Sequence, residues 1–156
     1  STHSFHFSFS GGEPTVVPTL VPLLDSLRDD IQNCNWVSTH LTSNISRKLD
    51  WWKQYVEVTK DFHRVSITAS YHKEHVNDER KRSDFATKLE YLQSQDVQVT
   101  INSVMVPERF DELWEDANYF HERGINVTLK PQSDPTASFV VESEFFITSD
   151  SISKSF

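Results

Sequence analysis

The chain has 156 residues, of which 37% are hydrophobic and 12% aromatic, so it is long and apolar enough to bury a core and is not intrinsically disordered. Its formal net charge of -8 would repel a nucleic-acid backbone, so nucleic-acid binding is not expected. The single cysteine, Cys34, excludes an internal disulfide and a multi-cysteine metal site.

Five segments with the residue pattern of β-strands recur about every thirty residues. The first alternates phenylalanine with histidine and serine, and the third is rich in β-branched residues. This interval is typical of βαβ units and predicts an α/β fold with an open parallel sheet, which also fits an arc of a TIM-barrel-like β/α domain. The expected strands are residues 4–10, 36–41, 64–70, 97–106 and 125–131.

Apolar residues at helical spacing fill the intervals between these strands. Thr19 and Ser46 are the expected N-caps of the first two helices. Phe110 is expected on the inward face of the fourth helix, and Gly124 is expected to end that helix in a left-handed conformation. The expected helices are residues 18–32, 47–59, 84–95 and 108–123.

The repeat breaks after residue 132. We interpret residues 1–132 as one partial β/α domain and residues 133–156 as a C-terminal tail. Within the tail, residues 139–147 have the composition of one further strand.

The sequence shows no apolar run of transmembrane length and no secretory leader. We therefore expect a cytoplasmic protein that does not bind membranes. The one basic cluster, residues 79–82, is short, and we interpret it as a solvated loop rather than a docking patch.

The segment Gly11, Gly12, Glu13 and Pro14 directly follows the first expected strand. Ligand sites in parallel α/β folds gather at the carboxyl ends of strands, and glycines there let a ligand approach the backbone. The Glu13 carboxylate suits an ammonium group, and Pro14 fixes the turn into the helix. A tight turn with a solvent-facing glutamate explains these four residues equally well.

The surrounding pattern resembles the radical S-adenosylmethionine (SAM) superfamily from about residue 5 to residue 131. In that family a GGEP segment contacts the amino group of the SAM methionine through backbone carbonyls and nearby polar groups. Ser43 and Asn44 match the family's next strand end, where Ile45 replaces a glycine. The resemblance implies a cofactor-binding set of Gly11, Gly12, Glu13, Pro14, Ser43, Asn44, Thr68, Asn102 and Lys130.

The family also holds a 4Fe–4S cluster through a CxxxCxxC segment, and this chain has none. Cys34 stands alone before a different strand. The resemblance therefore implies a fragment of a radical SAM enzyme that lacks the first β/α unit, cannot hold the cluster and cannot cleave SAM to a 5′-deoxyadenosyl radical. Without the cluster, SAM should bind no more tightly than about millimolar. Catalytic residues and substrate are not indicated, and the alternative is a non-catalytic small-ligand or protein-interaction module.

A histidine pair and the exposed first strand are weaker indications of function. His72 and His75 have a spacing that suits a metal, but a third ligand is not visible, and an exposed loop pair is favoured. The first strand would be an unpaired edge with phenylalanines on one face, which favours pairing with another chain. We therefore expect a homodimer, with the first strand or the C-terminal tail at its interface.

Overall fold

The computed structural model of the chain describes residues 3–132 and 145–147. These residues form one six-stranded sheet in which strand order follows chain order. The first five strands are parallel, and the last pairs with the fifth in the antiparallel direction. The strands are β1 (Ser4–Phe9), β2 (Trp36–Ser43), β3 (Arg64–Tyr71), β4 (Gln98–Met105), β5 (Asn126–Pro131) and β6 (Phe145–Ile147).

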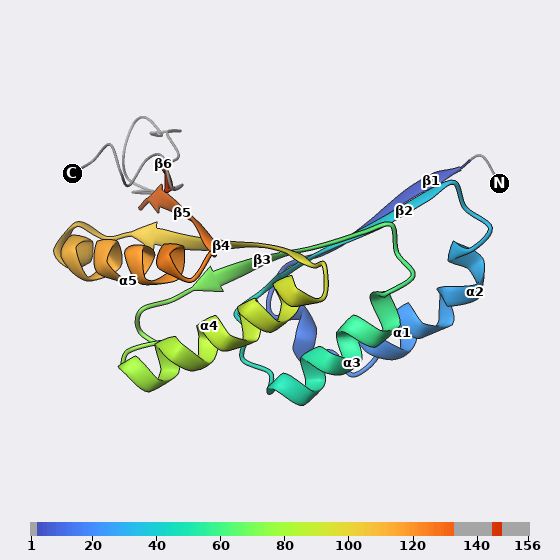
Figure 1. Cartoon of the computed structure of the whole chain (residues 1–156), viewed down its shortest axis with the longest axis horizontal. Coiled ribbons are helices and arrows are strands. Elements are labelled where there is room, and N and C mark those ends of the chain that lie inside the picture. Colours follow the sequence, from blue (N-terminus) through green and yellow to red (C-terminus); the bar gives the residue numbers. More distant parts are fainter. Residues whose placement is uncertain (1–2, 133–144, 148–156) are drawn as a thin grey trace.

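Helices fill every interval between the parallel strands and lie on one face of the sheet (Figure 1). The parallel α/β architecture expected from the strand interval is thus confirmed. No helix in the described ranges is long and apolar enough to cross a bilayer. The helices are α1 (Leu20–Ser26), α2 (Arg28–Ile31), α3 (Leu49–Thr59), α4 (Glu79–Ser94) and α5 (Phe110–Glu122), with short 3₁₀ turns at η1 (Pro14–Val16) and η2 (Pro107–Arg109).

The first expected helix is divided, and the second begins later than its sequence suggests. Between α1 and α2 the Leu27 N–H bonds to the carbonyl three residues back at 3.2 Å, which interrupts the α-helical pattern. Thr19 precedes α1 but makes no side-chain cap bond. Helix α3 starts after Lys48 rather than after Ser46, because the Ser46 N–H is held by the Asn44 side chain at 3.0 Å in a local turn.

Helix α4 begins at Glu79, ahead of the expected start at residue 84. Asp78 is the reason, because its carboxylate accepts the Lys81 N–H at 2.7 Å and caps the first turn. The basic segment interpreted as a loop is therefore the first turn of a helix, and that interpretation is wrong.

Helix α5 confirms one expectation and corrects another. Gly124 follows it with φ +82°, the left-handed conformation expected of a glycine at this position. Phe110, expected to face inward, is 44% exposed and stacks on Trp114 with ring centroids 6.0 Å apart. Because Phe110 is the first residue of α5, the buried stripe of the helix begins only at Leu113.

The hydrophobic core lies between the sheet and the helix layer. Leu41, Ile67 and Ile101 occupy alternate positions of β2, β3 and β4 and are at most 1% exposed. From the helices, Trp52 and Phe120 fill the space with comparable burial. Burial of large side chains on one face of the sheet provides the main favourable free energy of the fold.

The two edges of the described sheet differ. Beside β5, residues 145–147 add the antiparallel strand β6, which confirms the last part of the strand expected in the tail. The remainder of that expected strand lies outside the described residues. At the other edge β1 pairs only with β2, and Phe5 on it is 47% exposed. An apolar edge strand of this kind is a template for pairing with another chain.

We expect the chain to dimerise through β1, because a second copy would pair with its free backbone groups and cover Phe5. Light scattering at micromolar concentration should give twice the 18.1 kDa chain mass. Phe5→Lys should shift the population to monomer, whereas Leu23→Lys, at an equally exposed leucine on α1, should not. A wild-type monomer would contradict this expectation.

Candidate functional site

A double-glycine turn leaves the carboxyl end of β1. Gly11 and Gly12 have φ of +84° and +59°, a region that side chains with a Cβ rarely adopt. A Cβ built at either position would meet no atom within 4 Å, so conformation and not crowding requires glycine here. No hydrogen bond reaches either glycine carbonyl within the part of the chain that the structure describes. The turn therefore presents free backbone acceptors to solvent.

Glu13 clamps this turn to the end of β2. One carboxylate oxygen accepts the Thr15 hydroxyl at 2.5 Å, the Thr15 N–H at 3.3 Å and the Ser43 hydroxyl at 2.8 Å. The other accepts the Asn44 N–H at 2.6 Å. Because its carboxylate is occupied by these donors, Glu13 holds the loop in place, and the glycine carbonyls remain as the turn's open acceptors.

The end of β2 is itself built around polar contacts. The Ser43 hydroxyl accepts the Ile45 N–H at 3.0 Å. Ile45 has φ +60°, unusual for a β-branched residue, and its side chain is only 2% exposed. Arg47 donates from Nε to the Thr15 carbonyl at 2.9 Å, a second link between the two loops. Burial of the Ile45 side chain offsets the backbone strain at this position.

The face of the sheet opposite the helices is polar. On it, His40 Nδ1 lies 2.7 Å from the Ser66 hydroxyl and Nε2 lies 2.9 Å from the Thr68 hydroxyl. Burial lowers the pKa of His40, and the charges of His6 and Arg64 lower it further. The lowered pKa favours the neutral imidazole, in which one ring nitrogen donates and the other accepts.

Three of the implied site residues follow along this sheet. Thr68 on β3 is bonded to His40, as described. Asn102 on β4 is in register with Ser70 on one side and Thr128 on the other. Lys130 lies near the carboxyl end of β5. Parallel sheets are usually apolar on both faces, so this row of hydroxyl and amide groups is suited to a ligand or to a barrel interior.

Of the nine implied site residues, the structure brings Glu13, Ser43 and Asn44 into direct contact. Gly11, Gly12 and Pro14 belong to the same turn. Thr68, Asn102 and Lys130 lie on the three successive strands of the sheet beyond β2. The set thus runs across the carboxyl half of the sheet rather than forming one compact cluster.

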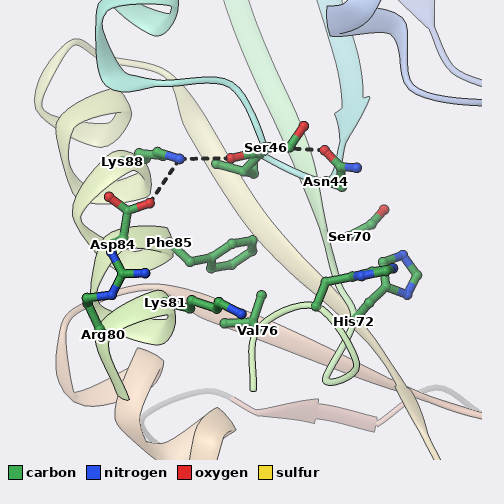
Figure 2. A pocket seen from close by; sticks show the side chains of 12 residues that line it. Asn44, Ser46, Ser70, His72, Val76, Arg80, Lys81, Asp84, Phe85 and Lys88 are labelled. Carbon is green, nitrogen blue, oxygen red and sulfur yellow. Dashed lines mark hydrogen bonds and ion pairs between the residues drawn. The ribbon is translucent and has the colours of Figure 1, made fainter. Parts of the chain in front are cut away.

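A cavity of about 400 Å³ lies beside this edge, between the β2–α3 loop, the β3–α4 loop and α4 (Figure 2). The sequence did not identify the cationic wall of this cavity, which is formed by Arg80 and Lys81. The residue at which α4 begins determines which way these side chains face, and the sequence placed that start too late. Arg80 and Lys81 line the cavity, whereas the adjacent Arg82 bonds to Asp116 at 2.9 Å on another side of the helix. The remaining residues that line it are Asn44, Ile45, Ser46, Ser70, His72, His75, Val76, Asp84, Phe85 and Lys88.

Asp116 is a buried carboxylate that fixes the neighbouring loop. It is 2% exposed and accepts the Tyr71 hydroxyl at 2.6 Å and the Lys73 ammonium at 2.8 Å, besides Arg82. Burial, together with the hydrogen bond to Asp116, raises the pKa of Tyr71. Tyr71 is therefore a structural residue, while His72 next to it is exposed and lines the cavity.

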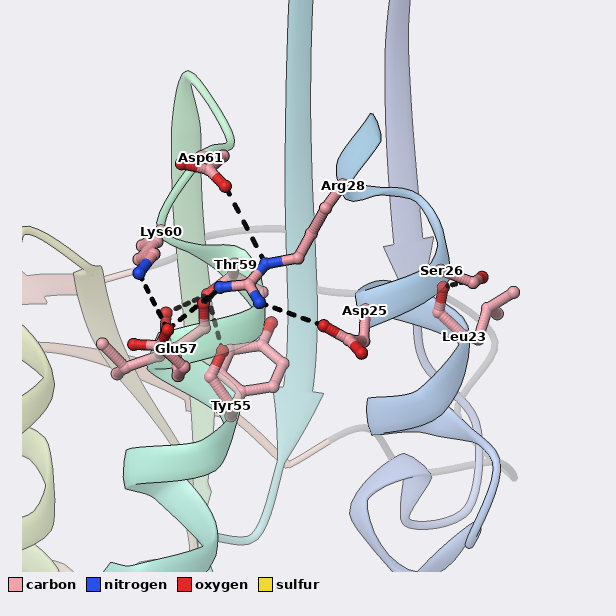
Figure 3. Close-up of polar contacts among 10 residues, drawn as sticks. Leu23, Asp25, Ser26, Arg28, Tyr55, Glu57, Thr59, Lys60 and Asp61 are labelled. Carbon is pink, nitrogen blue, oxygen red and sulfur yellow. Dashed lines mark hydrogen bonds and ion pairs between the residues drawn. The ribbon is translucent and has the colours of Figure 1, made fainter. Parts of the chain in front are cut away.

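A second ion cluster joins α2 to α3 (Figure 3). Arg28 donates to the Glu57 carbonyl at 2.5 Å and pairs with the carboxylates of Asp25 and Glu57, both at 3.1 Å. Glu57 also accepts from Lys60 at 2.8 Å. Arg28 and Lys60 each have a carboxylate partner within the cluster, so its role is to link the two helices.

The residues present do not fit a cysteine-ligated cluster. Cys34 is partly buried and donates from Sγ to the Asp30 carbonyl at 3.4 Å, before the amino end of β2 and away from the glycine turn. Within residues 3–132 and 145–147, no three His, Cys, Asp or Glu side chains are grouped as metal ligands. His72 and His75 do face each other, with ring centroids 6.1 Å apart.

No protein-family model matches this chain, and no curated protein matches it. The function is therefore inferred from the geometry of the site. It offers open backbone acceptors at the glycine turn, a polar sheet face and a cavity with a cationic wall.

Glu13→Ala should lower the free energy of unfolding by about 2–3 kcal/mol, because it leaves the part-buried donors of Thr15 and Ser43, and the exposed Asn44 N–H, without their acceptor. Urea unfolding measures the change. Glu74→Ala removes an exposed carboxylate with only a 3.8 Å ion pair and should cost less than about 0.5 kcal/mol. Equal small effects in both variants would contradict the clamp.

His40 should make the protein less stable in acid. Its folded-state pKa is lowered, so the unfolded chain binds more protons as pH falls below the ordinary value of 6.5, and stability drops until the folded pKa is passed. His40→Gln should therefore show a smaller loss of unfolding free energy between about pH 7.5 and pH 5. The exposed His72→Gln serves as the control and should keep the wild-type loss. If H40Q loses as much unfolding free energy as the wild type between these pH values, His40 is not the source of the acid sensitivity.

Proposed function

We propose that this chain is part of a radical SAM-type β/α domain and binds an adenosylmethionine-like ligand at the carboxyl edge of its sheet. The observation that carries this is the turn of Gly11 and Gly12, held by Glu13 with its carbonyls free. A ligand ammonium group would donate to these carbonyls, since the Glu13 carboxylate is already engaged within the chain.

The arrangement of the sheet supports the same proposal. Strand order follows chain order, and all helices lie on one face, as in an arc of a β/α barrel. The uncovered face then corresponds to a barrel interior, which accounts for its polar groups. Thr68 and Asn102 would contact the ribose or adenine of the ligand, because hydroxyl and amide side chains both donate and accept hydrogen bonds.

The proposal concerns binding and not SAM cleavage by this chain alone. Cleavage in the family requires three thiolates on a cluster, and the chain has one cysteine, placed before the amino end of β2. The chain's own residues therefore bind and orient the ligand.

A second candidate is a protein-interaction module. It is favoured by the free edge of β1, where Phe5 is 47% exposed beside an apolar groove lined by Phe7, Leu27 and Val37. An edge strand with such a groove suits recognition by strand addition.

Titration with SAM, followed by the amide NMR signals of Gly11 and Gly12, tests the proposal. We expect a dissociation constant of about 1 mM or weaker. The analogue 5′-methylthioadenosine lacks the amino-acid group, so it should leave the glycine signals unshifted.

Thr68→Val should weaken SAM binding, whereas Thr87→Val on the exposed side of α4 should not. Micromolar affinity would show a complete SAM-binding module. No shift at about 10 mM SAM would refute SAM binding and favour the interaction module.

A further inference from the structure

The cavity beside α4 has an unusual charge balance for this chain. Three cations, Arg80, Lys81 and Lys88, line it against one carboxylate, Asp84. The whole chain carries a formal net charge of -8, so a local cationic excess runs against the general composition. Such local concentration of charge attracts small anions.

The cations of this wall differ in how many hydrogen bonds and ion pairs they make within the chain. Lys88 is buried, pairs with Asp84 at 3.0 Å and donates to the Ile45 carbonyl at 3.2 Å, as Figure 2 shows. Lys81 donates only to the neutral Asn77 side chain, at 3.0 Å. The Arg80 side chain has no hydrogen bond or ion pair within the described ranges. Lys88 therefore shapes the cavity, while Arg80 and Lys81 keep their charge available.

Several other cations pair with carboxylates: Arg28, Arg82 and Arg123 each do so at 3.1 Å or less, and Lys73 does so at 2.8 Å. Arg47 and Arg64 donate to neutral oxygens, but neither of them lines this cavity. Two adjacent cations without a carboxylate, on the wall of a cavity, are consistent with a ligand that supplies the missing negative charge. Arg and Lys are the side chains that most often bind phosphate.

The rest of the cavity is suited to an organic group. Val76 and Phe85 give it an apolar surface, with His72 nearby (Figure 2). Ile45 and His75 also line the cavity. Its volume of about 400 Å³ is within the range of small-molecule sites. Serine hydroxyls from Ser46 and Ser70 at the rim complete a set of anion and hydrogen-bond donors around an apolar base.

We propose that this cavity binds the phosphate monoester of a small, partly apolar molecule. Arg80 and Lys81 contact the phosphate, and the organic part packs on Phe85 and Val76. A single phosphate suits two cations, whereas a nucleic-acid backbone would meet the negative charge of the rest of the chain. The site adjoins the proposed SAM site, because Asn44 also lines the cavity, but its cations come from α4 and not from the glycine turn.

Calorimetric titration without SAM tests this site directly. Phenyl phosphate, inorganic phosphate and phenol separate the contributions of the phosphate and of the organic group. We expect phenyl phosphate to bind at least about tenfold more tightly than inorganic phosphate, and phenol not to bind measurably. Raising the salt concentration should weaken the binding of both anions, because exposed charges are screened.

The double variant Arg80→Gln/Lys81→Gln should lose at least about tenfold of the phenyl phosphate affinity. Its control, Arg64→Gln/Lys60→Gln, removes the same charges at the amino end of β3 and should bind as wild type. Circular dichroism verifies that both variants fold. Equal affinity of the two double variants would overturn the cationic site, and equal affinity for inorganic and phenyl phosphate would overturn the organic subsite.

Discussion

The handedness of strand crossovers is the constraint on which the rest of this structure depends. A parallel connection almost always turns to the right, and here the strand order never reverses. Successive crossovers of one hand place every helix on the same side of the sheet (Figure 1). The core therefore forms on that side only, and the other face is free to carry His40, Thr68 and Asn102.

Two carboxylates organise the loops at the carboxyl ends of the strands. Glu13 joins the loop after β1 to the end of β2. Asp116 joins the end of β3 to α4 and α5 through Tyr71 and Arg82. The cavity lies between these two anchored regions, so its walls are positioned by hydrogen bonds that a ligand does not have to break.

The sequence predicts the strands well because period-two patterns and a regular interval are local signals. Helix starts were less accessible: Asp78 is one of several polar residues in its segment, and only its bond to Lys81 identifies it as the cap. The facing of Arg80 toward the cavity follows from that start. The partners of Asp116 are also hidden, since Tyr71 lies 45 residues away along the chain. Contacts of this kind depend on how the helices are placed in space, and they produce no periodic pattern in the sequence.

Consecutive strand order has one more consequence. Each β/α unit packs chiefly on the unit before it and the unit after it, as in a solenoid. Stability is then approximately a sum of unit and interface terms, and we expect local opening of the β1 unit to leave the β4–β5 pairing intact. A sheet built in this way can gain or lose a β/α unit at an edge without changing the pairing of the strands that remain. The number of strands is therefore set by how many β/α units the sequence encodes, and the fold itself does not fix it.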